Sequence, residues 1–166
     1  MSRSIQFEIN SVSEIDELQR IAERRCLDKN ANFTPMRRRV FCEVAANDRS
    51  IGAYDLTDLI STPLARVNVA TVYKALDFLV EMGLVTKVKS NRAYALANLR
   101  LKPKKGAATI TFVCRKTGVV KEVQSPLLSA VLRQEAENAG FTGISNAIEV
   151  EGMIRASHAG SGGLAE

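Results

Sequence analysis

Residues 68–85, NVATVYKALDFLVEMGLV, decide the fold that the rest of the chain supports. Their apolar side chains recur every three or four positions, which predicts one face of a helix (Val69, Val72, Tyr73, Leu76, Leu79 and Val80). Asn68 is a typical N-cap residue, and Gly83 is a typical stop signal. A second face carries small, hydroxyl and basic groups from Thr71, Lys74 and Ala75. Such a helix can lie in a DNA major groove, although this stretch alone is better explained as an ordinary core helix.

The flanking segments change that weighting, because they predict a winged helix-turn-helix. Residues 14–29 show helical periodicity, and Thr34-Pro35 is an N-cap followed by proline at the first helical position of a second helix. A short third helix is predicted over 53–61. Residues 84–99 predict two strands joined at Ser90-Asn91. In this order the helix over 68–83 is predicted to be the groove helix of a winged-helix domain that spans residues 1–97.

A second, smaller unit follows a basic hinge. The hinge covers residues 98–108, NLRLKPKKGAA, and is punctuated by proline and glycine. Residues 109–158 predict two strands, a helix over 125–140 and a last strand over 144–154. About fifty residues bury too little surface to be stable alone, so we expect this α/β unit to pair with a second copy. Residues 159–166 are predicted to be a flexible tail, and the fold class is α+β.

The charge of the chain favours a polyanionic partner. Its 166 residues carry a net charge of +5, and no Asp or Glu occurs between Met82 and Lys121, where ten Lys and Arg residues lie. The sequence has no apolar run of about 18 residues, which would be needed to span a membrane. Three widely spaced cysteines do not form a disulfide framework. We therefore expect a cytoplasmic protein with reduced thiols and no membrane partner.

Several segments resemble the ferric uptake regulator (Fur) superfamily, and they are most similar to its zinc uptake regulator (Zur) branch. These segments are TPMRRRVFCEV, GAYDLTDLI, TVYKALDFLVEMGLVTKVKS, RAYALANL, FVCRKTGVVKEV, AVLRQEAENAGF and IEVEGM. The resemblance covers roughly residues 14–157. It implies a dimeric transcriptional regulator with an N-terminal winged helix and a C-terminal α/β dimerisation domain. In the family, bound zinc stabilises the conformation that binds double-stranded DNA.

Most zinc ligands that the resemblance implies are missing from this chain. The positions that match the four thiolates of the structural site are Cys114, Thr117, Ile154 and Ser157. The positions that match the regulatory site are Thr86, Ala97, Ala107 and Glu122. Only Glu122 keeps a ligand type in the second set, and an exposed glutamate on a strand needs no special function. His158, the one histidine, adjoins the glycine-rich tail, so we expect degenerate metal sites and no zinc cofactor.

The resemblance also implies which residues reach DNA. At the groove it places Tyr54, Thr71, Tyr73 and Lys74. Lys74 stands where the family usually has Arg, and lysine lacks the bidentate fork that reads guanine, so weaker base specificity is expected. The residues expected to contact phosphate are Arg37, Arg38, Lys87, Lys89 and Arg92. For the arginines near the start of the second helix, a solvated helix face explains the sequence equally well.

Two hypotheses about function follow. The first is a DNA-binding regulator, acting as a repressor through a homodimer, that works without metal control or senses another signal. The second is a non-sensing partner that forms heterodimers with a true zinc regulator and modulates it. An enzyme is not expected, because the sequence shows no nucleophile–base pair, no phosphate-binding glycine loop and no second histidine.

Overall fold

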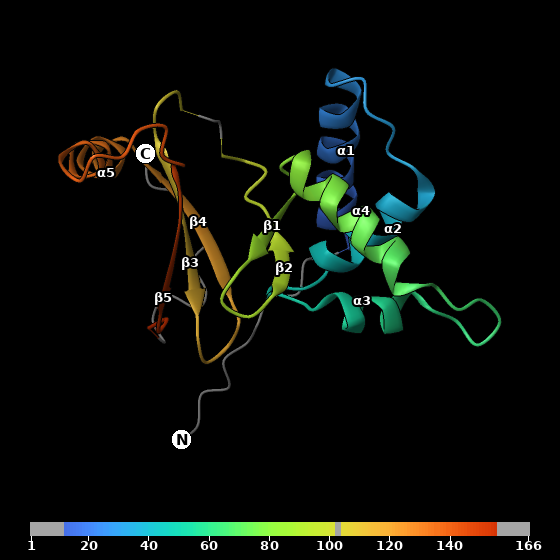
Figure 1. The fold of residues 1–166 in the computed structure, drawn as a ribbon. Coiled ribbons are helices and arrows are strands. Elements are labelled where there is room, and N and C mark those ends of the chain that lie inside the picture. Colours follow the sequence, from blue (N-terminus) through green and yellow to red (C-terminus); the bar gives the residue numbers. More distant parts are fainter. Residues whose placement is uncertain (1–11, 102–103, 156–166) are drawn as a thin grey trace.

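The computed structural model describes residues 12–101 and 104–155, and Figure 1 shows that they form a helical unit and a sheet unit with a small hairpin between them. The helical unit contains α1 (Val12–Asp28), α2 (Pro35–Ala45), α3 (Ala53–Ile60) and α4 (Val69–Glu81). The hairpin, which we call the wing, pairs β1 (Val85–Val88) with β2 (Ala93–Leu96) in antiparallel register. This order is that of a winged helix, as predicted.

Local sequence signals set the helix ends. The hydroxyl of Thr34 accepts a hydrogen bond from the backbone N–H of Arg37, and Pro35 occupies the first turn of α2. The side chain of Asn68 accepts from the N–H of Ala70 at 2.8 Å, which caps α4. Gly83 ends α4 with φ +67°, a conformation that favours glycine. These predicted caps and the stop are confirmed.

The core of the winged helix lies among its four helices and the wing. Phe41, Leu56, Leu76 and Leu79 have no solvent exposure there. The rings of Phe33 and Phe41 meet edge-on, with centroids 6.0 Å apart and an interplanar angle of 73°. This pair fixes the loop before α2 against α2, and α2 in turn packs against α4, which orients the predicted groove helix.

The C-terminal unit is a three-stranded mixed sheet with one helix. It contains β3 (Ala108–Cys114), β4 (Val120–Ser125), α5 (Pro126–Asn138) and β5 (Ala147–Gly152). The strand order is β4-β3-β5, with β3 antiparallel to β4 and parallel to β5. β5 begins later than predicted, because the Ser145 hydroxyl accepts from the N–H of Ala147 in a local turn before the strand, and it ends at Gly152 rather than at residue 154. The α+β fold class is confirmed.

The wing packs directly on the sheet of the C-terminal unit. Val88 and Ala95 of the wing form a small buried cluster with Val113, against which Val120 packs. The backbone N–H of Ser50 also donates to the carbonyl of Gly118 at 2.9 Å. No helix in the described part of the chain is both long and apolar enough to cross a membrane.

Candidate nucleic-acid interface

The groove face of α4 is exposed while its opposite face is buried. Thr71, Tyr73 and Lys74 lie at the surface, and Tyr73 is 39% exposed. The buried face is formed by Val72, Ala75, Leu76 and Leu79. Two details of the sequence reading were wrong: Ala75 belongs to the core, and Tyr73 does not belong to the apolar stripe. The reason is that α2, α3 and β1 together pack on the face of α4 that carries Val72, Ala75, Leu76 and Leu79.

Tyr54 and the loop before α4 extend this exposed surface. Tyr54 stands at the second position of α3 and is 69% exposed. Residues 61–68 form a loop that projects away from the helices in Figure 1. Sequence reasoning missed two exposed loop residues, Leu64 and Arg66. A basic residue two positions before the Asn68 cap was the signal that could have identified Arg66 as a candidate DNA contact.

The two arginines of α2 already have partners within the protein. The Arg37 guanidinium lies 3.5 Å from the centroid of the Phe78 ring, and it donates to the carbonyl of Asn32. Arg38 forms an ion pair with Glu23 at 2.9 Å. These contacts join α2 to α4 and to α1, so packing explains both arginines without a phosphate.

The basic residues of the wing are exposed. Lys87, Lys89 and Arg92 all lie at the surface, and the Lys87 ammonium is 6.0 Å from the centroid of the Tyr94 ring. Arg92 takes φ +54°, which completes the turn between the two strands. The structure therefore presents three cations on one hairpin, as a phosphate contact requires.

Glu149 holds the turn of the wing against the C-terminal unit. Its carboxylate accepts from the backbone N–H of Lys89 at 2.8 Å and from that of Ser90 at 2.9 Å. Partial burial raises the pKa of the Glu149 carboxyl, but the hydrogen bonds from Lys89 and Ser90 outweigh burial and leave the pKa below its ordinary value. Sequence reasoning did not identify this contact, which joins groups 59 positions apart.

Two of the four positions matched to the regulatory site, Thr86 and Glu122, form a hydrogen-bonded contact between the wing and β4. The Glu122 carboxylate accepts from the hydroxyl of Thr86, and its second oxygen accepts from the backbone N–H of Asn98 at 2.8 Å. Ala97 is 8% exposed, and Ala107 is partly buried. The expectation of a merely exposed strand glutamate was wrong, because the wing covers Glu122. A cavity of about 310 Å³ adjoins the contact, lined in part by Ala97 and Asn98.

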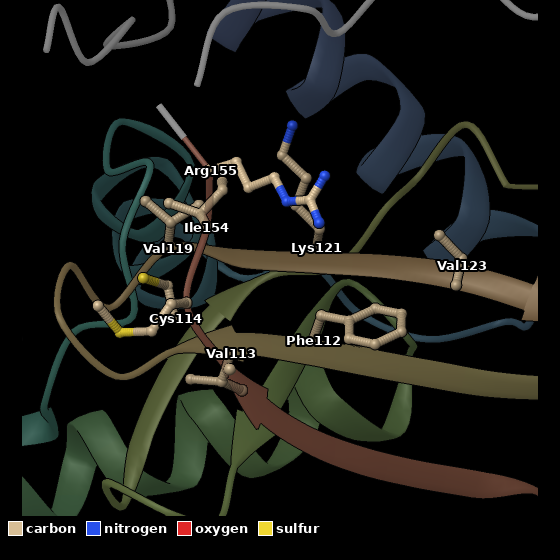
Figure 2. A pocket seen from close by; sticks show the side chains of 10 residues that line it. Phe112, Val113, Cys114, Val119, Lys121, Val123, Ile154 and Arg155 are labelled. Atoms are coloured by element: carbon tan, nitrogen blue, oxygen red, sulfur yellow. The ribbon is translucent and has the colours of Figure 1, made fainter. Parts of the chain in front are cut away.

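The structural-site positions surround a single thiol. Cys114 lies in a cavity of about 450 Å³, where Figure 2 shows its sulfur near Val119 and Ile154. The hydroxyl of Thr117 and the backbone N–H of Ile154 donate to the sulfur and lower the pKa of Cys114 to about 7, although burial raises it. Ser157 and His158 lie outside the described residues.

The donor sets at both places do not fit zinc. A tetrahedral site needs four donors among thiolate, imidazole and carboxylate groups. The described positions supply one thiolate in the first set and one carboxylate in the second, beside hydroxyl, methyl and aliphatic groups. Within residues 12–101 and 104–155, no three or more His, Cys, Asp or Glu side chains gather in a group that could hold a metal ion.

Comparisons with known proteins agree with this fold. The sequence model of the Ferric uptake regulator family matches residues 28–151. The chain is 36% identical over 140 residues to the Zinc uptake regulation protein of Escherichia coli (strain K12), with 84% of this chain and 81% of that protein covered.

Solved structures give the same result. A zinc uptake regulator complexed with zinc and DNA matches with a TM-score of 0.76 and 35% identity, covering 86% of this chain and 94% of that one. The holo form of XcZur matches with a TM-score of 0.72 and 26% identity, covering 87% and 99%. The apo form of XcZur gives a TM-score of 0.52 at 25% identity, covering 86% and 97%. On the family match and the identity over most of its length, this chain belongs to the ferric uptake regulator family.

Proposed function

We propose that this chain is a DNA-binding transcriptional regulator that binds operator DNA as a homodimer and does not require zinc. The observation that carries the proposal is the exposed surface shared by α3 and α4. It presents Tyr54, Thr71, Tyr73 and Lys74, while the buried face of α4 is anchored in the core. A helix-turn-helix presents its recognition helix to the major groove in this way. The similarity to a zinc uptake regulator complexed with DNA supports the same role.

The cationic residues around this surface supply the affinity. Lys87, Lys89 and Arg92 on the wing, together with Arg66 in the loop before α4, are exposed. Phosphate contacts by such residues give affinity that depends on salt, whereas base contacts give specificity. We assign Arg37 and Arg38 a smaller role in phosphate binding, since each already contacts an aromatic ring.

Zinc independence follows from the donor chemistry. The matched positions keep too few ligand atoms for either zinc site, and the hydroxyl and N–H groups beside Cys114 and Glu122 are hydrogen-bond donors. The TM-score of the chain against the holo form of XcZur, 0.72, is higher than that against its apo form, 0.52. This similarity to a holo form, in a chain without a zinc donor set, supports a regulator that takes up the arrangement without bound zinc.

Dimerisation through the C-terminal unit is supported by the apolar surface that this unit leaves exposed. On the sheet Phe112, Val123 and Val150 are 44%, 42% and 38% exposed, and on α5 Leu127 and Val131 are 76% and 50% exposed. Burying such side chains is favourable by about 1.5–3 kcal/mol each. A second copy that covers this surface would also protect the edges of a small sheet. Sedimentation at micromolar concentration should show a dimer, and a monomer of 18.1 kDa would contradict this part of the proposal.

The test is binding of the purified full-length chain to a duplex selected from a random library. Fluorescence anisotropy should show affinity falling about 10³-fold between about 50 and 200 mM salt if about six phosphates are contacted. Tyr54→Ala should weaken specific binding more than binding to random duplex. Failure to bind any duplex at about 50 mM salt would exclude the homodimeric regulator.

The second hypothesis, a partner that modulates a true zinc regulator through heterodimers, rests on the same apolar surface combined with the lost donors. Mixing the chain with a zinc-binding member of the family separates the two. Heterodimer formation without DNA binding by the homodimer would favour the modulator.

A further inference from the structure

The Glu122 carboxylate lies where three strands of the two units come together. Thr86 belongs to β1, Asn98 follows the end of β2, and Glu122 belongs to β4. One carboxylate oxygen accepts from the Thr86 hydroxyl and the other accepts from the Asn98 backbone N–H. The two oxygens therefore connect β1 and the end of β2 to the C-terminal unit. Asn98 and Thr86 lie 24 and 36 positions before Glu122 in the sequence.

We propose that Glu122 is a positioning residue for DNA binding, whose hydrogen bonds to Thr86 and Asn98 hold the wing in place where the family's zinc chemistry has been lost. This inference rests on the proposed function. Glu122 sets the angle at which the winged helix of each protomer meets DNA, and it does so without an effector. We call the contact among Thr86, Asn98 and Glu122 the carboxylate latch.

The groups around Glu122 are hydrogen-bond donors, which favours the latch over a metal site. A hydroxyl and an N–H group present hydrogen atoms to the carboxylate, whereas a cation needs lone pairs from every direction. Ala97, 8% exposed, adds only a methyl group close by. A carboxylate that accepts two such hydrogen bonds needs no bound ion to balance its polar groups. Hydrogen bonds to a charged acceptor are also about twice as strong as those between neutral groups.

The wing has other contacts with the C-terminal unit, so a single carboxylate can be sufficient to complete its attachment. Val88 and Ala95 of the wing are already buried against Val113 of the sheet. Glu149 fixes the turn at the far end of the wing. The latch therefore has to fix only the end of the wing that leads into the hinge.

Four variants of the full-length chain test the proposal: Thr86→Val, Glu122→Ala, the double variant and Glu122→Gln. Glutamine keeps one acceptor for the Asn98 N–H, and its amide can donate to the Thr86 hydroxyl, so the conservative variant should retain the latch. Glu151→Gln is the matched control, because Glu151 is an exposed carboxylate on β5. Two readouts are used: amide hydrogen exchange at Asn98 by NMR, and affinity for the selected duplex by anisotropy.

Glu122→Ala should accelerate exchange at Asn98 while leaving the buried α4 amides such as Leu79 unchanged, which separates local release from global unfolding. It should weaken DNA binding by roughly 5- to 150-fold, the usual range of coupling between sites. Thr86→Val should have a smaller effect, and the double variant should match Glu122→Ala alone because both act through one contact. Glu122→Gln and Glu151→Gln should resemble the wild type.

Two results on the contact itself would overturn the proposal. The first is unchanged Asn98 exchange in Glu122→Ala, and the second is full additivity of Thr86→Val with Glu122→Ala. If the wild type bound no duplex, the proposed function would fail, but exchange at Asn98 and the additivity measured on it would still decide the latch. If Glu122→Ala released Asn98 but bound DNA as tightly as the wild type, the positioning role would be refuted while the regulator remained.

Discussion

Replacing Glu149 with alanine should free the turn of the wing from the C-terminal unit. The carboxylate oxygens of Glu149 lie 2.8 Å and 2.9 Å from the backbone nitrogens of Lys89 and Ser90. Alanine removes both acceptors and leaves the two N–H groups to water.

The size of the effect follows from the exposure of these groups. A hydrogen bond to a charged group contributes about 1.5–3 kcal/mol to stability. Lys89 and Ser90 are exposed, so water replaces much of the interaction. We therefore expect a loss of about 1–2 kcal/mol for the pair, which corresponds to a factor of about 5–30 in a local opening equilibrium.

Hydrogen exchange by NMR measures this opening directly at the two amides. Exchange at Lys89 and Ser90 should accelerate about 5- to 30-fold in Glu149→Ala at pH 7. Glu151→Ala, which removes an exposed carboxylate from the same strand, should leave both rates unchanged. Equal exchange in the wild type and Glu149→Ala would show that Glu149 does not hold the turn.

The contact should also depend on pH in a defined direction. Because the pKa of Glu149 is lowered in the folded chain, its contribution to stability is fully present above the ordinary value of 4.5. It is lost as the pH falls through the lowered folded pKa. Protection of the two amides should therefore be constant near neutrality and should decrease in acid, whereas Glu149→Gln should show no such step.

Three further outcomes are expected. Phe41→Ala removes a side chain with no solvent exposure and should lower the free energy of unfolding in urea by about 3–5 kcal/mol, and a loss under 1 kcal/mol would refute the packing argument. Lys74→Ala should weaken binding to the selected duplex by about 1–3 kcal/mol if Lys74 contacts a base edge. The control is Lys29→Ala, which removes an exposed lysine directly after α1 and should cause a smaller loss; equal losses would leave Lys74 without a specific role. The rate of Cys114 alkylation, followed by mass spectrometry, should increase with pH around a midpoint near the Cys114 pKa of about 7. Thr117→Val should move that midpoint to higher pH, and an unchanged midpoint would mean that Thr117 does not stabilise the thiolate.

Local structure was predictable because its causes lie close together in the sequence. Thr34, Asn68 and Gly83 cap or end helices through groups a few residues away, and the structure has them in those roles. The two strands of the wing were predicted from alternation and a polar turn, and they pair with Val85 opposite Leu96. Short-range chemistry of this kind needs no knowledge of the tertiary fold.

Contacts between the two units were not predictable in the same way. Glu122 was expected to be an exposed carboxylate on a strand, and Glu149 was not singled out, since a strand pattern does not show that a hairpin from another unit will cover it. The stacking of Arg37 on Phe78 depends on helix packing between α2 and α4. The parallel pairing of β3 with β5 likewise depends on how the chain returns after α5.

The loss of metal ligands could be read from residue types, but its structural consequence could not. The sequence places a hydroxyl at Thr86 and a methyl group at Ala97, neither of which is among the usual zinc ligands, and it does not show that Thr86 donates to Glu122. Residue types therefore predict which ligand chemistry the chain does not offer, while the structure identifies the hydrogen bonds that these residues form.

The most direct test of zinc independence is the affinity of the purified full-length chain for its selected duplex, measured side by side in excess chelator and in micromolar zinc. The donor sets around Cys114 and Glu122 predict the same dissociation constant in both conditions. Binding that is abolished by the chelator and restored by zinc would contradict the account, because ligands outside the matched positions would then be holding the metal.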